Sequence, residues 1–299
     1  SITIPDSVTS IGDDAFSGCS SLTSVTIPEG VTSIGGAAFY NCVSLTSITI
    51  PDSVTSIGGA AFWGCSSLTS IMIGKGVTSI GTYAFSGCRS LSGVYITDLA
   101  KWCNISFYGS YQDYCHENPL AYAHNLYLNG TLVTNLVIPD SVTSICSYAF
   151  YGCRSLTSIT IPDSVTTIGD YAFNGCYKLV EVYNKSSLPI SAGSNAYGGV
   201  GYRAKAVYTE LFTSKLSVDK NGYILYTDGN TVFLIGYTGN ETSLILPTGI
   251  SEIYAYAFYD CSSLTSITIP DSVTSIGSHA FHYCSSLTSI TIGKGVASI

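Results

Sequence analysis

Residues 50–72, IPDSVTSIGGAAFWGCSSLTSIM, are one copy of a unit that recurs along the chain. Pro51 lies 23 residues after Pro28, which itself lies 23 residues after Pro5. A fixed period of this length is the signature of a repeat protein, in which each unit packs only on its neighbours. The phenylalanine and cysteine of the unit recur at eight stations, which are Phe16/Cys19, Phe39/Cys42, Phe62/Cys65, Phe85/Cys88, Phe150/Cys153, Phe173/Cys176, Phe258/Cys261 and Phe281/Cys284.

The consensus L-x-x-I-x-I-P-x-x-V-x-x-I-G-x-x-A-F-x-x-C-x-x predicts a coil with two short strands. Val25 and Ile27 alternate with hydroxyl residues, which is typical of a half-buried strand, and Pro28 ends that strand because it has no N–H to donate. A second extended pair ends at Ile34, where the repeat glycine is expected to permit a tight bend. A single helical or 3-10 turn at Phe39 closes the coil. Stacked coils would align equivalent strands in parallel ladders at about 4.7–4.9 Å.

The period fails in residues 97–137 and 184–245, leaving regular coils at 1–96, 138–183 and 246–299. We expect these segments to be modified coils within a single solenoid that covers residues 1–299. Because the sequence begins and stops inside repeats, both ends are expected to be cut within the array, with any export signal or anchor outside it.

Both interruptions contain hairpin signals. The first predicts short helices at residues 98–102 and 118–124 and a hairpin around Asn129-Gly130. The second predicts a restored strand at residues 204–208 and a hairpin across residues 223–237. Protruding loops on repeat proteins often make binding contacts, so the hairpins are interpreted either as contact elements or as spacers.

The composition is apolar and weakly charged. Hydrophobic residues make up 46% of the chain and charged residues 10%, whereas typical globular domains have about 25% charged residues. The surface is therefore expected to be neutral and rich in hydroxyl groups. The net charge of −8 and the scattered Lys and Arg residues argue against a nucleic-acid partner. No apolar run reaches the ~20 residues that span a bilayer, so no membrane-spanning segment is expected.

The consensus resembles the BspA-like leucine-rich repeat, also called the Treponema pallidum type. The match covers eight units and well over half of the chain. The resemblance implies a right-handed, β-rich leucine-rich-repeat solenoid from a bacterial protein that is secreted or displayed at the cell surface. It also implies adhesion to host proteins or to other cells, and it supplies no catalytic residues.

Few residues in the sequence suggest a disulfide, a metal site or a catalytic site. The eight station cysteines are interpreted as buried apolar residues. Cys103 and Cys115 either stay free or pair in an oxidising compartment, and with His116 and His124 a zinc site is conceivable without a C-x-x-C spacing to support it. The H-x-x-H of residues 279–282 is interpreted as surface variation. We predict no catalytic site, no metal and no cofactor, and hence no enzyme.

Exposed side chains at variable repeat positions are the candidate ligand contacts, since Tyr and Trp combine a large apolar body with a polar tip. They lie on the outward strand face and directly after the repeat phenylalanine: Thr26, Thr49, Met72, Tyr95, Thr160 and Tyr183, and Tyr40, Trp63, Tyr151 and Tyr259. The first hypothesis is an adhesion protein that contacts an extracellular host or cell-surface protein. The alternative is a carbohydrate-binding module in which exposed Tyr and Trp rings bind a glycan.

Overall fold

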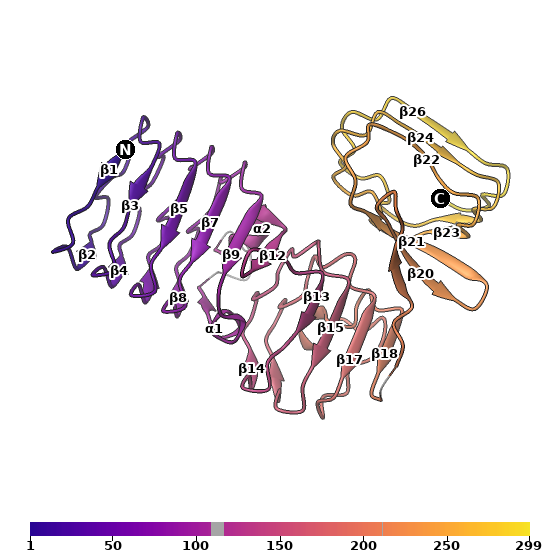
Figure 1. Ribbon diagram of the computed structural model, residues 1–299, viewed down its shortest axis with the longest axis horizontal. Coiled ribbons are helices and arrows are strands. Elements are labelled where there is room, and N and C mark those ends of the chain that lie inside the picture. The colour runs from indigo at the N-terminus through magenta and orange to yellow at the C-terminus, as the bar shows by residue number, and fades with distance from the viewer. Residues whose placement is uncertain (109–116, 211) are drawn as a thin grey trace. The chain divides into compact units, whose positions relative to one another are not determined.

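The computed structural model describes residues 1–108, 117–210 and 212–299. It divides into two compact units, Ser1–Glu210 and Leu211–Ile299, and each is described by itself (Figure 1). Both units consist of stacked coils with parallel strand ladders and very little helix, which confirms the predicted solenoid class. That the whole chain forms one continuous solenoid stays a prediction.

The first strands of most neighbouring coils pair in parallel with their equivalents one coil further on. Thr49 pairs with Met72, and Met72 pairs with Tyr95. Strands β5, β7 and β9 lie side by side in Figure 1, β11 follows β9 in the same ladder, and β1 pairs with β3. The first strands in this part of the chain are β1 (Ile2–Thr3), β3 (Val25–Thr26), β5 (Ser47–Ile50), β7 (Ser70–Ile73), β9 (Gly93–Ile96) and β11 (Leu126–Leu128).

The second strands form their own parallel ladder in the same coils. They are β2 (Ser10–Ile11), β4 (Ser33–Ile34), β6 (Ser56–Ile57), β8 (Ser79–Ile80) and β10 (Ser106–Phe107). In the four regular coils the serine lies toward solvent and the isoleucine is buried, as the consensus predicts, and in β10 Phe107 takes the place of the isoleucine. After the first interruption both ladders start again, with first strands β13 (Asn135–Val137), β15 (Ser158–Ile161), β17 (Glu181–Asn184) and β18 (Ala206–Tyr208) and second strands β14 (Ser144–Ile145) and β16 (Thr167–Ile168).

The corner that carries the repeat phenylalanine is a series of single 3-10-type turns. The Tyr40 N–H donates to the Ala37 carbonyl, and the Cys42 N–H donates to the Phe39 carbonyl. Between these turns, Ala37 and Asn41 have positive φ values of 50° and 54°. This alternation leaves the N–H groups of residues 37, 39 and 41 free to donate to the next coil, at 2.7–2.8 Å. The coils are therefore hydrogen-bonded to one another at the corner as well as along the strands.

The apolar core is a column of equivalent side chains. Phe39, Phe62 and Phe85 are buried and stack with ring centroids 5.3 and 5.4 Å apart. The exposed hydroxyl groups bind the coils together: Thr55 donates to the Thr32 carbonyl of the preceding coil at 3.1 Å. The same bond recurs 23 residues away in both directions. Much of the hydroxyl-rich surface thus serves the stacking of coils.

The repeat glycine is required by close packing between coils, which corrects the expected role in a bend. A Cβ at Gly58 would lie 2.5 Å from the Gly35 carbonyl carbon, whereas a Cβ at Gly12 would meet nothing within 4 Å. Cys146 and Tyr254 replace this glycine where the preceding coil is irregular, since their N–H groups donate to Cys103 and Leu234 of the interrupted segments. Glycine is needed only where a regular coil precedes it.

The first interruption contains the predicted helices and hairpin. Helix α1 (Leu99–Cys103) begins after Asp98, whose carboxylate accepts from the Lys101 N–H at 3.0 Å. Helix α2 (Leu120–Ala123) is shorter than the predicted 118–124, and Pro119, expected as the first helical residue, is its N-cap instead. Strand β11 then pairs with β9 in parallel and with β12 (Thr131–Leu132) in antiparallel fashion, so the hairpin closes the first ladder.

The second interruption contains a 3-10 turn, η1 (Tyr197–Gly199), and the restored strand β18, which pairs with β17 as predicted. In the second unit, β20 (Tyr223–Asp228) and β21 (Thr231–Tyr237) form the expected hairpin. Strand β19 (Leu216–Val218) adds a third, unpredicted antiparallel strand. Strand β21 also starts a parallel ladder with β23 (Glu252–Ile253) and β25 (Ser275–Ile276), beside a ladder of β22 (Ser243–Ile245), β24 (Ser266–Ile269) and β26 (Ser289–Ile292).

Candidate binding surfaces

The outward middle positions of the strands form what we call the first strand-face row: Thr49, Met72, Tyr95 and Tyr127. These residues are consecutive partners in the parallel register. The Tyr95 and Tyr127 rings stack with centroids 4.6 Å apart and an interplanar angle of 11°. Met72 is 38% exposed. The candidate contacts Thr49, Met72 and Tyr95 therefore lie side by side, while Thr26 is exposed on the separate β1–β3 pair.

A second strand-face row follows the first interruption. Val137, Thr160, Tyr183 and Tyr208 are consecutive partners on β13, β15, β17 and β18. The Lys185 ammonium lies over the Tyr183 ring, 5.1 Å from its centroid. The candidates Thr160 and Tyr183 are thus adjacent, and the row changes from aliphatic to aromatic along its length.

Tyr40, Trp63 and Tyr83 form what we call the first corner cluster. Trp63 lies between the other two, 6.2 Å from the Tyr40 ring and 5.4 Å from the Tyr83 ring. The sequence analysis expected residues directly after the repeat phenylalanine to be exposed, but Tyr40 and Trp63 are half-buried because neighbouring rings cover them. Tyr83 has a positive φ of 57°, which turns the corner backbone as in the other coils.

The second corner cluster consists of Tyr148, Tyr151 and Tyr171. Tyr148 stacks on Tyr171 of the next coil, with centroids 5.5 Å apart and an angle of 8°, and meets Tyr151 edge-on at 6.1 Å. The candidate Tyr151 is half-buried for the same reason as Trp63. Each cluster therefore joins rings from adjacent coils into one rigid aromatic surface.

The third corner cluster lies in the second unit and includes both histidines of the H-x-x-H motif. Tyr256 stacks on His279 at 4.9 Å, and Tyr259 stacks on His282 at 5.5 Å. Tyr283 contacts His282 at 4.1 Å and is 62% exposed. The imidazoles thus continue the aromatic columns of the preceding coil.

The sequence analysis missed several of these aromatic residues. Tyr127 lies in an interruption, where the repeat register cannot be read, yet β11 restores that register. Four others occupy the position two residues before the repeat phenylalanine, a variable position whose φ lies between 50° and 65° at all eight stations. They are Tyr83, Tyr148, Tyr171 and Tyr256. An aromatic residue at that position, next to one after the phenylalanine, is the signal that would have found the clusters.

The station cysteines are packing residues with suppressed thiol chemistry. The Cys65 thiol donates to the Phe39 carbonyl of the preceding coil at 3.1 Å, and Cys88 does the same to Phe62 at 3.2 Å. Burial raises the pKa of Cys65 to about 12, and the neighbouring Cys42 adds to the shift. A thiol with so high a pKa is almost wholly protonated at neutral pH and is a poor nucleophile or metal ligand.

The suggested disulfide and zinc sites depend on Cys115 and His116, which lie outside the described residues. His124 is described: its Nδ1 lies 3.1 Å from the Gly152 carbonyl, and burial lowers the pKa of its imidazole to about 4. Within the described ranges, no group of three or more His, Cys, Asp or Glu side chains is arranged to hold a metal ion. In the same ranges, no helix is long and apolar enough to cross a bilayer.

The stacked coils define a solenoid of the leucine-rich repeat class. A sequence profile described as the BspA type leucine rich repeat region, with six copies, matches residues 1–112, 123–199 and 233–299. The chain therefore belongs to the BspA-type leucine-rich repeat family. No curated protein gives a significant match to the chain.

Solved structures of similar proteins come from several bacteria. A leucine-rich cell surface protein from Faecalibacterium prausnitzii A2-165 is 29% identical, covering 98% of this chain and 69% of that protein with a TM-score of 0.38. A leucine-rich repeat protein from Bacteroides ovatus ATCC 8483 is 26% identical, covering 99% and 76%, with a TM-score of 0.41. The T. pallidum leucine rich repeat protein is 27% identical, covering 60% and 77%, with a TM-score of 0.40. The fold assignment rests on the family profile and the strand ladders.

Proposed function

We propose that this protein is a non-enzymatic, cell-surface or secreted protein that adheres to proteins of a host or of neighbouring cells. The observation that supports this most is the gathering of aromatic side chains into clusters and rows on a rigid repeat scaffold. Large, well-fixed Tyr and Trp side chains lose little conformational entropy on binding and dominate many protein interfaces. A stack of coils also supplies the extended surface that repeat proteins use for partners.

Ring stacking helps to choose between a protein and a glycan as the ligand of these surfaces. A sugar packs its C–H groups on the face of an aromatic ring, but Tyr95 covers Tyr127, and Tyr148 covers Tyr171, in nearly parallel pairs. Stacking covers one face of each of these rings and leaves fewer ring faces for a sugar, while the ring edges and hydroxyl groups stay available. These contacts suit hydrogen bonding and apolar packing against a protein. We therefore favour a protein ligand for the rows and clusters.

Binding of the full chain to immobilised fibronectin, laminin and collagen, and to epithelial cells, tests the proposal. We expect Trp63→Ala and Tyr40→Ala to weaken binding at least about tenfold, the scale of an interface hot spot. Tyr108→Ala is the matched control, since Tyr108 is an exposed aromatic residue outside the rows and clusters. A glycan array with the same variants tests the alternative. Binding to glycans alone, lost in Trp63→Ala, would replace the protein-binding proposal with the carbohydrate-binding one.

A further inference from the structure

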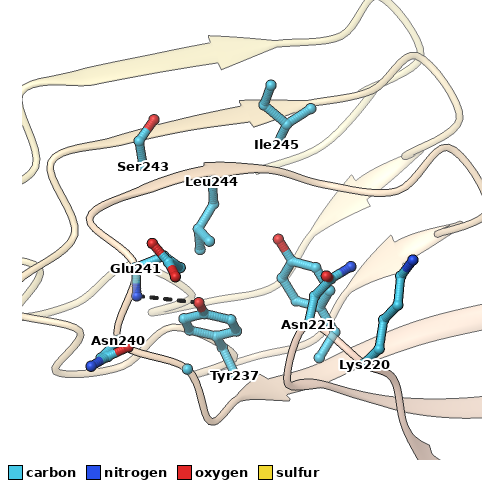
Figure 2. Close-up of a pocket in the computed structure, with 10 residues that line it drawn as sticks. Lys220, Asn221, Tyr237, Asn240, Glu241, Ser243, Leu244 and Ile245 are labelled. Atoms are coloured by element: carbon cyan, nitrogen blue, oxygen red, sulfur yellow. Dashed lines mark hydrogen bonds between the residues drawn. The ribbon is translucent and has the colours of Figure 1, made fainter.

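A cavity of about 390 Å³ lies within the second unit and shares no residue with the rows and clusters (Figure 2). Three segments enclose it: the turn at residues 219–222, the loop at residues 238–242 and the edge strand β22. Ligand pockets in proteins typically measure about 300–1,000 Å³, so the cavity has the size for one small ring-shaped ligand.

The two polar walls are fixed by hydrogen bonds. On one side, the Asp219 carboxylate accepts from the N–H groups of Asn221 and Tyr223, both at 2.9 Å. On the other side, the Thr238 N–H and hydroxyl both donate to the Gly222 carbonyl, at 2.9 and 3.0 Å. The loop that follows is therefore tied to the turn across the base of the hairpin. Walls held in this way offer a preorganised set of polar groups to a ligand.

Two tyrosines form the floor. Tyr223 and Tyr237 are only 3% and 7% exposed, and their ring centroids lie 5.3 Å apart. The Glu241 N–H donates to the Tyr237 hydroxyl at 3.4 Å, as Figure 2 shows. Gly239 packs directly against the Tyr237 hydroxyl, and a side chain there would collide with it. The floor is thus apolar and closely packed.

The rim combines opposite charges and amides with an exposed apolar edge. Lys220 and Asn221 lie on one side of the pocket, and Asn240 and Glu241 lie on the opposite side (Figure 2). On the third wall, Ile245 is 78% exposed, a large apolar surface for a single side chain. The pocket therefore suits a ligand with both C–H and hydrogen-bonding surfaces.

The arrangement of charge narrows the class of ligand. Because Lys220 and Glu241 lie on opposite sides, a ligand with net charge would meet a like charge on one of them, which favours a neutral ligand. A neutral sugar fits both, because its hydroxyl groups accept from the ammonium and donate to the carboxylate. We propose that this pocket binds one neutral sugar ring, a hexose or an N-acetylated hexosamine at the end of a glycan. This inference goes beyond the adhesion proposal, and either can fail without the other.

Titration calorimetry and saturation-transfer NMR on the full chain test the inference with glucose, galactose, mannose and the N-acetylated forms of glucosamine and galactosamine. We expect at least one of these sugars to bind, and Asn221→Ala and Glu241→Gln to weaken that binding about tenfold each, as for hydrogen bonds lost from a binding site. Asn230→Ala, an exposed asparagine at the other end of the same hairpin, should leave the affinity unchanged.

Three results would overturn the inference. The first is that none of these sugars binds. The second is that the two pocket variants bind the sugar as well as the original protein does. The third is that glucuronate or glycine binds more tightly than every neutral sugar. Thermal melts of both pocket variants, whose changed side chains lie at the rim, separate loss of the site from loss of the fold.

Discussion

The coil at residues 50–72 and the segment at residues 223–245 each contribute a strand to a parallel ladder. They differ in which strands pair with that strand and in the surface that they leave exposed. In the regular coil, β7 pairs in parallel on both sides, with β5 and β9. In the hairpin segment, β21 pairs in parallel only with β23, and its other neighbour is the antiparallel β20. The regular coil buries its inward-facing repeat side chains, such as Val54, Ile57 and Phe62, whereas the hairpin segment lines an open pocket. The regular coils supply rigid surfaces of aligned side chains, and the hairpin segment supplies a pocket.

The same contrast explains why some coils have another residue in place of the repeat glycine. A coil with regular neighbours has its backbone fixed from both sides, so Gly58 admits no side chain. A coil that follows an irregular segment has more room, and Cys146 or Tyr254 takes the place of the glycine. The following predictions test this contrast, beginning with the largest expected effect.

Removing a core ring from a regular coil should have the largest effect. Phe62 is fully buried between two other rings, so Phe62→Ala should lower the free energy of unfolding by about 3–5 kcal/mol. Phe16 is half-buried and stacks on one repeat phenylalanine only, so Phe16→Ala should cost clearly less. Urea unfolding followed by fluorescence measures both. An unchanged unfolding midpoint for Phe62→Ala would contradict the stacked-coil core.

Adding a methyl group between two coils should have the next largest effect. A Cβ at Gly58 would collide with the Gly35 backbone, so Gly58→Ala should cost about 1–3 kcal/mol. Gly12 has the same place in the repeat but no neighbour within 4 Å of such a Cβ, so Gly12→Ala should be close to neutral. Equal destabilisation by both, in parallel denaturation curves, would show that glycine is needed for the bend instead.

The fold could be predicted from the sequence because the same local signals for strands and turns recur in many coils. The alternation at Val25 and Ile27, the end of the strand before Pro28 and the turn signal at Asn129-Gly130 act locally, and the structure confirms all three. The role of the glycine was misjudged because it depends on the distance between coils, which the pattern within one coil does not contain.

The candidate surfaces were only partly predictable for the same reason. Thr49, Met72 and Tyr95 are equivalent repeat positions, so their adjacency follows from the period. Tyr127 joins the row through the register of an irregular strand, and the pocket needs three segments that no period relates. Contacts made within the repeat can be read from the sequence, whereas contacts made by the interruptions require the structure.

Alkaline pH should lower the stability of the protein through its buried column of station cysteines. Burial raises the pKa of Cys42 to about 11 and that of Cys65 to about 12, whereas an exposed thiol has a pKa of about 8.5. The folded state therefore holds these protons more tightly than the unfolded state. Their contribution to stability is fully present below the unfolded pKa and is lost as pH rises through the folded values. Urea unfolding from about pH 8 to about pH 11 should show this decline, and Cys65→Ala should make it shallower. Identical slopes for the two proteins would contradict the assignment.

The smallest effects should come from exposed ion pairs, of which one pair between regular coils and one pair in the hairpin segment can be compared. Lys75 lies 3.1 Å from Asp52 in a regular coil, and Lys215 lies 2.7 Å from Asp228 across the hairpin strands. Asp52 also accepts the Lys75 backbone N–H from the next coil, and this bond, with the Lys75 side chain, lowers the pKa of the carboxyl group.

Lys75→Ala keeps that backbone bond and should cost about 0–1 kcal/mol, as exposed ion pairs do, with less effect at high salt. Asp52→Ala removes both bonds and should cost more, and its contribution should fade as pH drops, because a lowered carboxyl pKa stabilises only the ionised form. Lys215→Ala should likewise cost about 0–1 kcal/mol, because the Lys215–Asp228 pair is also exposed. If Asp52→Ala is no worse than Lys75→Ala in urea unfolding, the bond from the Lys75 N–H to the Asp52 carboxylate contributes nothing to the stacking of these two coils.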